Sequence, residues 1–398
     1  MATATRTKSA ASQRVAPAPT RTETATVALL SLARESGADT RLPSFLQLRE
    51  SLGVSVVTLN KALATLEAHQ VLYRRHGVGI FVSPHVKRRM VSIVVNPRFA
   101  VSEPGGVAEE SPVWGVLVGF LKTHLDTAGH DFNVQVLADE SPDTTPLYTD
   151  FARAVSEARV HGVLGIGVTE KAIRFFSEHQ VPVVTFAGEG DHRIELDNPA
   201  LIASATRALL QSGCHRLALV LPGTSNGITD TFAEEDIAAS RHLRAFADTL
   251  RGFGVPLLPH FIYDGGFLAR AGFTTIVPTA LWHLGYRVGQ SLFAGAERAD
   301  GVVCTNDVVA SGLLTAAQEA NIGIGSQVRF ATHANTTLST LTPWAGRIIR
   351  LAVSPDEIAR RMLVKLNHLM AGNTDPEPRE RYLATVLPPT VPTEPERN

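Results

Sequence analysis

Two neighbouring stretches of the sequence carry side chains that suit contact with nucleic acid. In residues 56–68, apolar residues recur at helical spacing and would form one buried face. The opposite face and its flanks then present Val57, Thr58, Asn60 and Lys61. In residues 71–82, two β-prone runs enclose a Gly-Val-Gly turn that carries Arg74, Arg75, His76 and Gly77. Polar side chains on a helix can hydrogen-bond to base edges in a major groove, whereas cationic side chains bind phosphates.

These side chains need a scaffold of three helices and a hairpin, and the sequence carries the signals for one. Residues 23–37 have the apolar spacing of a first helix. Ser44 is placed to cap a second helix and Ser55 to cap a third, with Gly53 as the turn between them. A lone basic hairpin is more often a solvated tip, but this one directly follows a capped helix-turn-helix. We therefore predict a winged helix-turn-helix over residues 21–84.

Charge is unevenly distributed along the 398 residues, although the formal net charge is only −1. Residues 1–90 hold 13 Lys and Arg against 5 Asp and Glu, or +8, while the rest holds 24 against 33, or −9. A basic N-terminal domain on an acidic body is typical of a DNA-binding domain joined to a domain with another task. Residues 1–20 are rich in small residues and Pro and hold no acid. We expect a disordered tail there and a basic linker over residues 85–89.

The segments Leu42-Pro43-Ser44, Leu52-Gly53-Val54-Ser55 and Tyr73-Arg74-Arg75-His76-Gly77 resemble the GntR-type winged helix. By position, the resemblance implies DNA contacts from Ser44, Ser55, Val57, Thr58, Asn60, His76 and Gly77. Two arginines usual in that family are replaced here by Leu46 and Val56, so the affinity or the preferred operator must differ from the family norm. Val57 could pack on a thymine methyl group, and Asn60 could read adenine.

From residue 91 onward, strand and helix signals alternate. Apolar runs at residues 91–95, 132–137, 162–166 and 181–186 are each followed or preceded by a helical segment, and the same alternation starts again at residue 216. We expect the later strands at 257–263, 301–304 and 328–332. Such runs predict parallel sheets covered on both faces, in two successive units. Two such lobes would place a ligand site at the carboxyl ends of their strands, in a cleft between them.

This second part resembles the LacI/GalR effector domain, which is similar to periplasmic sugar-binding proteins. The resemblance rests on Gly162-Val163-Leu164-Gly165, on Asp197-Asn198 and above all on Asp300-Gly301 and Asn306-Asp307 with Gly312. A GntR-type winged helix joined to such a domain resembles arabinose-repressor-type regulators. The fold class that we expect is therefore α/β, with an N-terminal winged helix-turn-helix and a two-lobed periplasmic-binding-protein-like sensor domain over residues 90–398.

By position, the resemblance implies that Asp197 and Asp307 contact the ligand. The alternative for Asp307 is an N-cap on the helix that starts at Val308. The other candidates are Asn96, Arg98, Trp114, Arg241, His242, Asn306 and His333. Trp114 could equally be a core residue, and Asn306 could tie its loop together. An arginine and an aspartate of the family are replaced by His242 and Ala334, which leaves the ligand class open.

The sequence argues against an enzyme. It has no phosphate-binding loop, no Gly-x-Ser-x-Gly turn and no His or Cys cluster with metal spacing, so we expect no cofactor and no metal. Cys214 and Cys304 lie in apolar runs and are expected to be reduced, buried thiols. Neither a membrane span nor a secretory signal is evident, which favours the cytoplasm and argues against the alternative of an exported solute-binding protein.

Together these observations predict a sequence-specific DNA-binding transcription regulator. We expect a homodimeric repressor that binds a double-stranded DNA operator and responds to a small polar effector, a sugar or related metabolite, bound between the two lobes. A regulator that binds DNA without any ligand is the remaining alternative.

Overall fold

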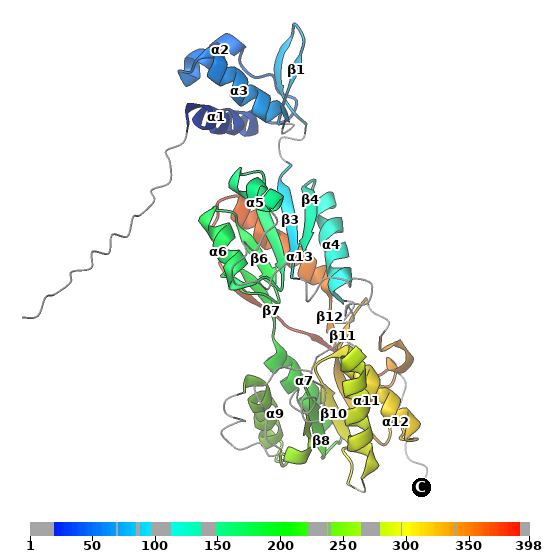
Figure 1. Cartoon of the computed structure of the whole chain (residues 1–398). Helices are drawn as coiled ribbons and strands as arrows, with labels where there is room; N and C mark the ends of the chain where they lie inside the picture. Colours follow the sequence, from blue (N-terminus) through cyan, green and yellow to red (C-terminus); the bar gives the residue numbers. More distant parts are fainter. Residues whose placement is uncertain are drawn as a thin grey trace, which may run out of the picture. The chain divides into compact units, whose positions relative to one another are not determined.

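The computed structural model describes residues 20–68, 71–84, 88–96, 113–136, 149–221, 237, 240–263, 279–295, 297–337 and 340–390. The chain divides into two compact units, Met1–Arg88 and Arg89–Asn398 (Figure 1). Most of the tail expected at 1–20, residues 85–87 of the expected linker, and the candidate ligand residue Arg98 lie outside the described residues.

The first unit holds three helices and a two-stranded hairpin. The helices are α1 (Arg21–Ser36), α2 (Phe45–Leu52) and α3 (Val56–Ala68), and the strands are β1 (Leu72–Arg75) and β2 (Gly79–Val82). β1 and β2 pair antiparallel, with Leu72 opposite Val82. Leu29 of α1, Leu48 of α2 and Leu63 of α3 are fully buried in one core. The winged helix-turn-helix predicted from the sequence is confirmed.

The second unit contains two six-stranded sheets. The first has the order β13-β7-β6-β5-β3-β4, and each neighbouring pair is parallel. Its strands are β3 (Met90–Val95), β4 (Asp131–Val136), β5 (Gly162–Ile166), β6 (Val183–Phe186), β7 (Arg193–Leu196) and β13 (Arg379–Tyr382). Its helices are α4 (Val113–Thr127), α5 (Thr149–Ser156), α6 (Glu170–Glu178) and α13 (Pro355–Met370). α4 and α13 share one apolar core with the sheet, and α5 and α6 share another, so both faces are covered.

The second sheet has the order β14-β12-β11-β10-β8-β9. Its strands are β8 (Leu217–Val220), β9 (Ile262–Tyr263), β10 (Gly301–Cys304), β11 (Arg329–Asn335), β12 (Ile349–Val353) and β14 (Thr385–Leu387). The helices α7 (Asn198–Gln211) and α9 (Arg241–Gly252) cover one face, and α11 (Thr279–Ala294) and α12 (Asp307–Glu319) cover the other. The described residues of this half also form two 3-10 turns, η2 (Pro259–Phe261) and η3 (Thr342–Trp344).

The backbone passes between the two sheets three times, from β7 to α7, from β12 to α13 and from β13 to β14. The sequence analysis named no strand at β7 or β13, and the expected parallel pattern is broken by β14, which pairs antiparallel with β12. The strand expected at 257–263 is also too long. Pro259 has no N–H and a fixed φ, so it starts the 3-10 turn η2, and only Ile262 and Tyr263 pair with β8.

Helices α11 and α12 lie side by side and pack with their backbones in near contact (Figure 1). A Cβ atom on Gly312 would lie 2.1 Å from the carbonyl oxygen of Trp282, and one on Gly285 would lie 1.9 Å from that of Val309. Neither space can hold a methyl group, because the obstructing atoms belong to backbone. These two glycines therefore fix how closely α12 approaches α11.

Gly312→Ala should lower the free energy of unfolding by about 3 kcal/mol, since the methyl group must push the two helices apart. Urea unfolding of the full chain measures this change. Gly119→Ala in α4 is the matched control, because an exposed helical glycine with open space around it should gain about 0.5 to 1 kcal/mol from the same substitution. Equal effects of the two substitutions would contradict the close approach.

Candidate functional site

The exposed face of α3 is formed by the residues that the sequence placed there. The Ser55 hydroxyl accepts a hydrogen bond from the backbone N–H of Thr58 at 3.1 Å, which caps the helix. Val57 is 64% exposed although it is apolar, and Asn60 and Lys61 are exposed beside it. An exposed apolar side chain among polar ones, on a helix held by a packed core, suits contact with a partner surface.

The two arginines of the wing, Arg74 and Arg75, have different partners. Arg74 forms an ion pair with Glu67 of α3, so its charge is partly compensated. Arg75 lies over the ring of Phe81, with its guanidinium carbon 4.9 Å from the ring centre, and donates a hydrogen bond to the Tyr73 hydroxyl at 3.3 Å. No acid among the described residues pairs with Arg75. Its charge is thus held in place but remains available to an external anion.

Other predicted DNA contacts fall at helix and hairpin ends. Ser44 caps α2 and exchanges hydrogen bonds with Gln47, and both residues are exposed. His76 and Gly77 are exposed at the wing turn, where Gly77 has a φ of 69°. Arg41 was not predicted as a DNA contact, but it is an exposed cation whose backbone forms an isolated antiparallel bridge with Phe81 of the wing. Its position directly before Leu42-Pro43-Ser44 was the available signal.

In the second unit, the two neighbours Asn306 and Asp307 have separate roles. The Asn306 side chain accepts hydrogen bonds from the N–H groups of Val308 and Val309, at 2.9 and 3.0 Å. Asn306 is therefore the N-cap of α12, and the alternative that gave this role to Asp307 is wrong. Asp307 is 1% exposed, and its Oδ2 accepts a hydrogen bond from the Asn335 amide at 3.1 Å.

Three further candidates already have protein partners. Asp197 caps α7 by accepting the N–H of Ala200 at 2.9 Å, and its second oxygen lies 3.3 Å from Arg381 of β13. The Asn96 amide donates to the carbonyl of Gly167 at 3.0 Å. Trp114 packs against Phe186 with the ring centres 6.0 Å apart, at the edge of the first lobe's core. These contacts give each residue a structural role, whatever else it binds.

The two histidine candidates lie on different elements. His242 follows the exposed Arg241 at the start of α9, and burial together with the charge of Arg241 lowers its pKa. His333 lies on β11, where burial lowers its pKa and the charge of Asp307 opposes that shift. The Nδ1 atom of His333 is buried without a hydrogen-bond partner. Both side chains are expected to be neutral at neutral pH.

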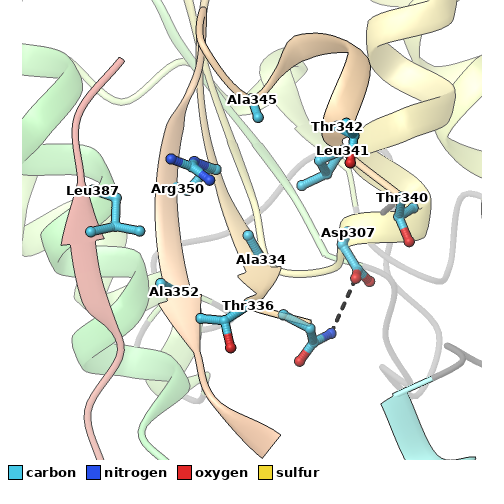
Figure 2. A pocket seen from close by; sticks show the side chains of 11 residues that line it. Asp307, Ala334, Thr336, Thr340, Leu341, Thr342, Ala345, Arg350, Ala352 and Leu387 are labelled. Carbon is cyan, nitrogen blue, oxygen red and sulfur yellow. Dashed lines mark hydrogen bonds between the residues drawn. The ribbon is translucent and has the colours of Figure 1, made fainter. Parts of the chain in front are cut away.

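One pocket of about 200 Å³ lies in the second lobe, at the carboxyl ends of β10 and β11 (Figure 2). Of the predicted ligand residues within the described ranges, Asp307 alone lines it. The remaining lining residues are Ala334, Asn335, Thr336, Thr340, Leu341, Thr342, Ala345, Arg350, Ala352 and Leu387. Figure 2 shows Asp307 and Arg350 on opposite sides of the pocket. Arg350 was not among the predicted ligand residues, because the face of β12 that it occupies is set by pairing with β11 and β14.

Residues 32–82 match the bacterial regulatory proteins of the gntR family, and residues 206–388 match the periplasmic binding protein-like domain. The chain joins a GntR-type DNA-binding domain to a LacI-type effector domain. The fold and the two domain families predicted from the sequence are thus confirmed, and the gntR family consists of bacterial regulatory proteins rather than enzymes. No curated protein matches this chain.

Solved structures share the fold at low sequence identity. A LacI-family regulatory protein from Chloroflexus aggregans is 15% identical, with 76% of this chain and 98% of that chain covered and a TM-score of 0.55. The transcriptional regulator CelR in complex with cellobiose is 15% identical, with coverages of 93% and 98% and a TM-score of 0.52. A periplasmic binding protein/LacI regulator from Alkaliphilus metalliredigens with D-xylulofuranose is 12% identical, with coverages of 75% and 97% and a TM-score of 0.52.

Within the described residues, no helix is both long and apolar enough to cross a membrane. The same part of the chain has no group of three or more His, Cys, Asp or Glu side chains arranged to hold a metal ion.

The lowered pKa of His333 makes the stability of this regulator depend on pH. Above about pH 6.5 the imidazole is neutral in both states, and below it the unfolded chain takes up a proton that the folded chain resists. Stability should therefore fall as the pH drops from about 7.5 to about 5.5. His333→Gln should reduce this fall in urea unfolding measured across that range, whereas His215→Gln, at an exposed position, should not. Parallel profiles for His333→Gln and wild type would contradict the assignment.

Proposed function

We propose that this chain is a homodimeric repressor whose affinity for a DNA operator is controlled by a small polar ligand, a sugar or related metabolite, bound between the two lobes. The main support for this proposal is that one chain combines two features. One is a capped helix-turn-helix with exposed residues on α3, and the other is an α/β unit with a polar pocket at the carboxyl ends of its strands.

The geometry of the first unit supports insertion of α3 in a major groove. Asn60 has an amide that can bond to adenine in two places, and the exposed methyl groups of Val57 can pack on a thymine methyl. Arg75 and Lys61 can bind the phosphates that flank the groove. A single such unit covers only a few base pairs, so sequence selection in a genome favours two copies on a two-fold symmetric operator.

The second unit supports binding of a hydroxylated ligand through Asp307. Each oxygen of the carboxylate accepts one hydrogen bond from the protein, from the Val308 N–H and the Asn335 amide. Each oxygen has a second lone pair, so Asp307 can still accept hydrogen bonds from ligand hydroxyl groups. Two structures with this fold, CelR and the Alkaliphilus metalliredigens protein, are complexes with cellobiose and with D-xylulofuranose.

Replacing Arg75 with Ala should weaken binding to every DNA duplex and lower the dependence of log affinity on log salt by about 0.9, because one phosphate contact is lost. Arg74→Ala should have a smaller effect, since Glu67 already compensates that charge. Fluorescence anisotropy on a labelled duplex across a salt series measures both, and titration at high concentration should give two chains per operator.

Asn60→Ala is the control for this experiment, because it should change which operator is preferred without changing the salt dependence. An Arg75→Ala protein with wild-type affinity at every salt concentration would contradict a phosphate-binding wing.

Asp307→Asn should bind the operator like wild type but lose the response to ligand. The N-cap of α12 is Asn306, which this substitution leaves in place. The amide of Asn has one acceptor oxygen and one donor NH2 group, so one of the two oxygens that can accept hydrogen bonds from ligand hydroxyl groups is lost. In wild type, a sugar or polyol found by thermal shift of the full chain should change operator affinity by about 1 to 3 kcal/mol. Operator binding with and without that compound measures the change in both proteins. An unaltered response of Asp307→Asn would remove Asp307 from the ligand site.

A further inference from the structure

Arg350 is the charged group of the pocket that the proposed function does not use. It is the second residue of β12, opposite Thr332 of β11 on one side and Leu387 of β14 on the other. Its Nε atom is buried and has no hydrogen-bond partner. No carboxylate or carbonyl oxygen among the described residues accepts a hydrogen bond from its guanidinium group, and its side chain lines the pocket.

The surroundings of Arg350 make this arrangement costly in the absence of an anion. Side chains alternate along β11, so Ala334 and Phe330 share the face on which Thr332 and Arg350 lie, and both belong to the apolar core under α11 and α12. A guanidinium stays protonated at any physiological pH. Arg350 is half-buried, so its charge is partly removed from water without a protein partner, which is unfavourable. Arginine is also the residue best shaped to bind carboxylate or phosphate in a bidentate manner.

No acid of the pocket serves as that partner. Asp307, the acid among the lining residues, is bound by Asn335 and by the Val308 N–H and makes no ion pair with Arg350. Ala334, which lies between the two in Figure 2, offers only a methyl group. The pocket therefore presents a cation on one side and the Asp307 carboxylate on the other, and Thr336, Thr340 and Thr342 also line it.

We propose that Arg350 binds the anionic group of the ligand, and that the pocket takes a small hydroxylated acid rather than a neutral sugar. Its carboxylate or phosphate pairs with the guanidinium, and its hydroxyl groups bond to Asp307 and the threonines. A volume of about 200 Å³ lies below the usual range of about 300 to 1,000 Å³ for small-molecule sites, so the ligand has few carbon atoms. This inference rests on the proposed function in that it names the ligand class of the same unit.

The test compares full-length wild type with Arg350→Met, which keeps the length of the side chain and removes its charge. Arg347→Met is the matched control, because Arg347 is exposed two residues before β12. In sodium chloride alone, Arg350→Met should unfold at the same temperature as wild type or a higher one, since a half-buried charge without a protein partner is removed. A lower melting temperature for this variant, with no effect of anions on wild type, would make Arg350 a structural residue and overturn the proposal.

The ligand class is tested with three matched probes at constant ionic strength: glycerate, glycerol 3-phosphate and glycerol. Glycerate or glycerol 3-phosphate should raise the melting temperature of wild type and of Arg347→Met by about 2 to 4 °C. The dissociation constant of the effective anion should be about tenfold or more higher for Arg350→Met than for wild type. Which of the two is effective distinguishes a carboxylate from a phosphate. Glycerol as effective as the anions, or anions equally effective in Arg350→Met, would overturn the proposal.

Operator binding separates this proposal from the proposed function. If an anion stabilises wild type through Arg350 but leaves operator affinity unchanged, the anion site stands and ligand control of DNA binding fails. If instead a neutral sugar changes operator affinity equally in wild type and Arg350→Met, ligand control stands and the anion site fails.

Discussion

The first turn of α12 is the constraint on which the proposed ligand site depends. Its two N–H groups are bound by the side chain of Asn306, and its backbone is pressed against α11 at Gly312. With the helix fixed in both ways, Asp307 has no freedom to turn away from the end of β10. The carboxylate is then oriented by Asn335 from β11. In the proposed function, a carboxylate positioned in this way before any ligand arrives lowers the entropy cost of binding.

A second constraint lies where the backbone crosses three times between the two sheets. Tyr382 connects these three crossings by hydrogen bonds. Its hydroxyl accepts a hydrogen bond from the N–H of Ser354 at 3.1 Å, and its carbonyl accepts one from the N–H of Asp197 at 3.0 Å. Tyr382 is itself buried and ends β13, so it contacts the other two passages. Any movement of one lobe against the other must pass through these few residues. Asp197, a predicted ligand contact, therefore also takes part in this linkage, and its substitution would change the linkage as well.

Local signals predicted most of the fold, and non-local pairing explains what they missed. The helices of the first unit could be read from Ser44, Gly53 and Ser55, because a cap acts within three residues of itself. β7 and β13 could not be predicted in this way, because neither strand is apolar throughout. They pair with each other, as at Arg193 and Arg379, across more than a hundred residues of sequence. At the site, two adjacent polar residues can each cap a helix, and only the backbone geometry decides between them.

Arg350 was unpredictable for a related reason. Isoleucine, leucine and valine around it mark a buried strand, but which face an arginine meets depends on how β12 registers with β11 and β14. The same register places the positive charge of Arg350 at the pocket. The chain beyond residue 90 carries a formal charge of −9, which at a distance repels an anion. That repulsion is screened over about 8 to 10 Å in physiological salt, whereas one ion pair at about 4 Å gains roughly 4 kcal/mol near a protein surface. A single unpaired guanidinium in a partly enclosed pocket therefore outweighs the acidic body around it at the range where a ligand is recognised.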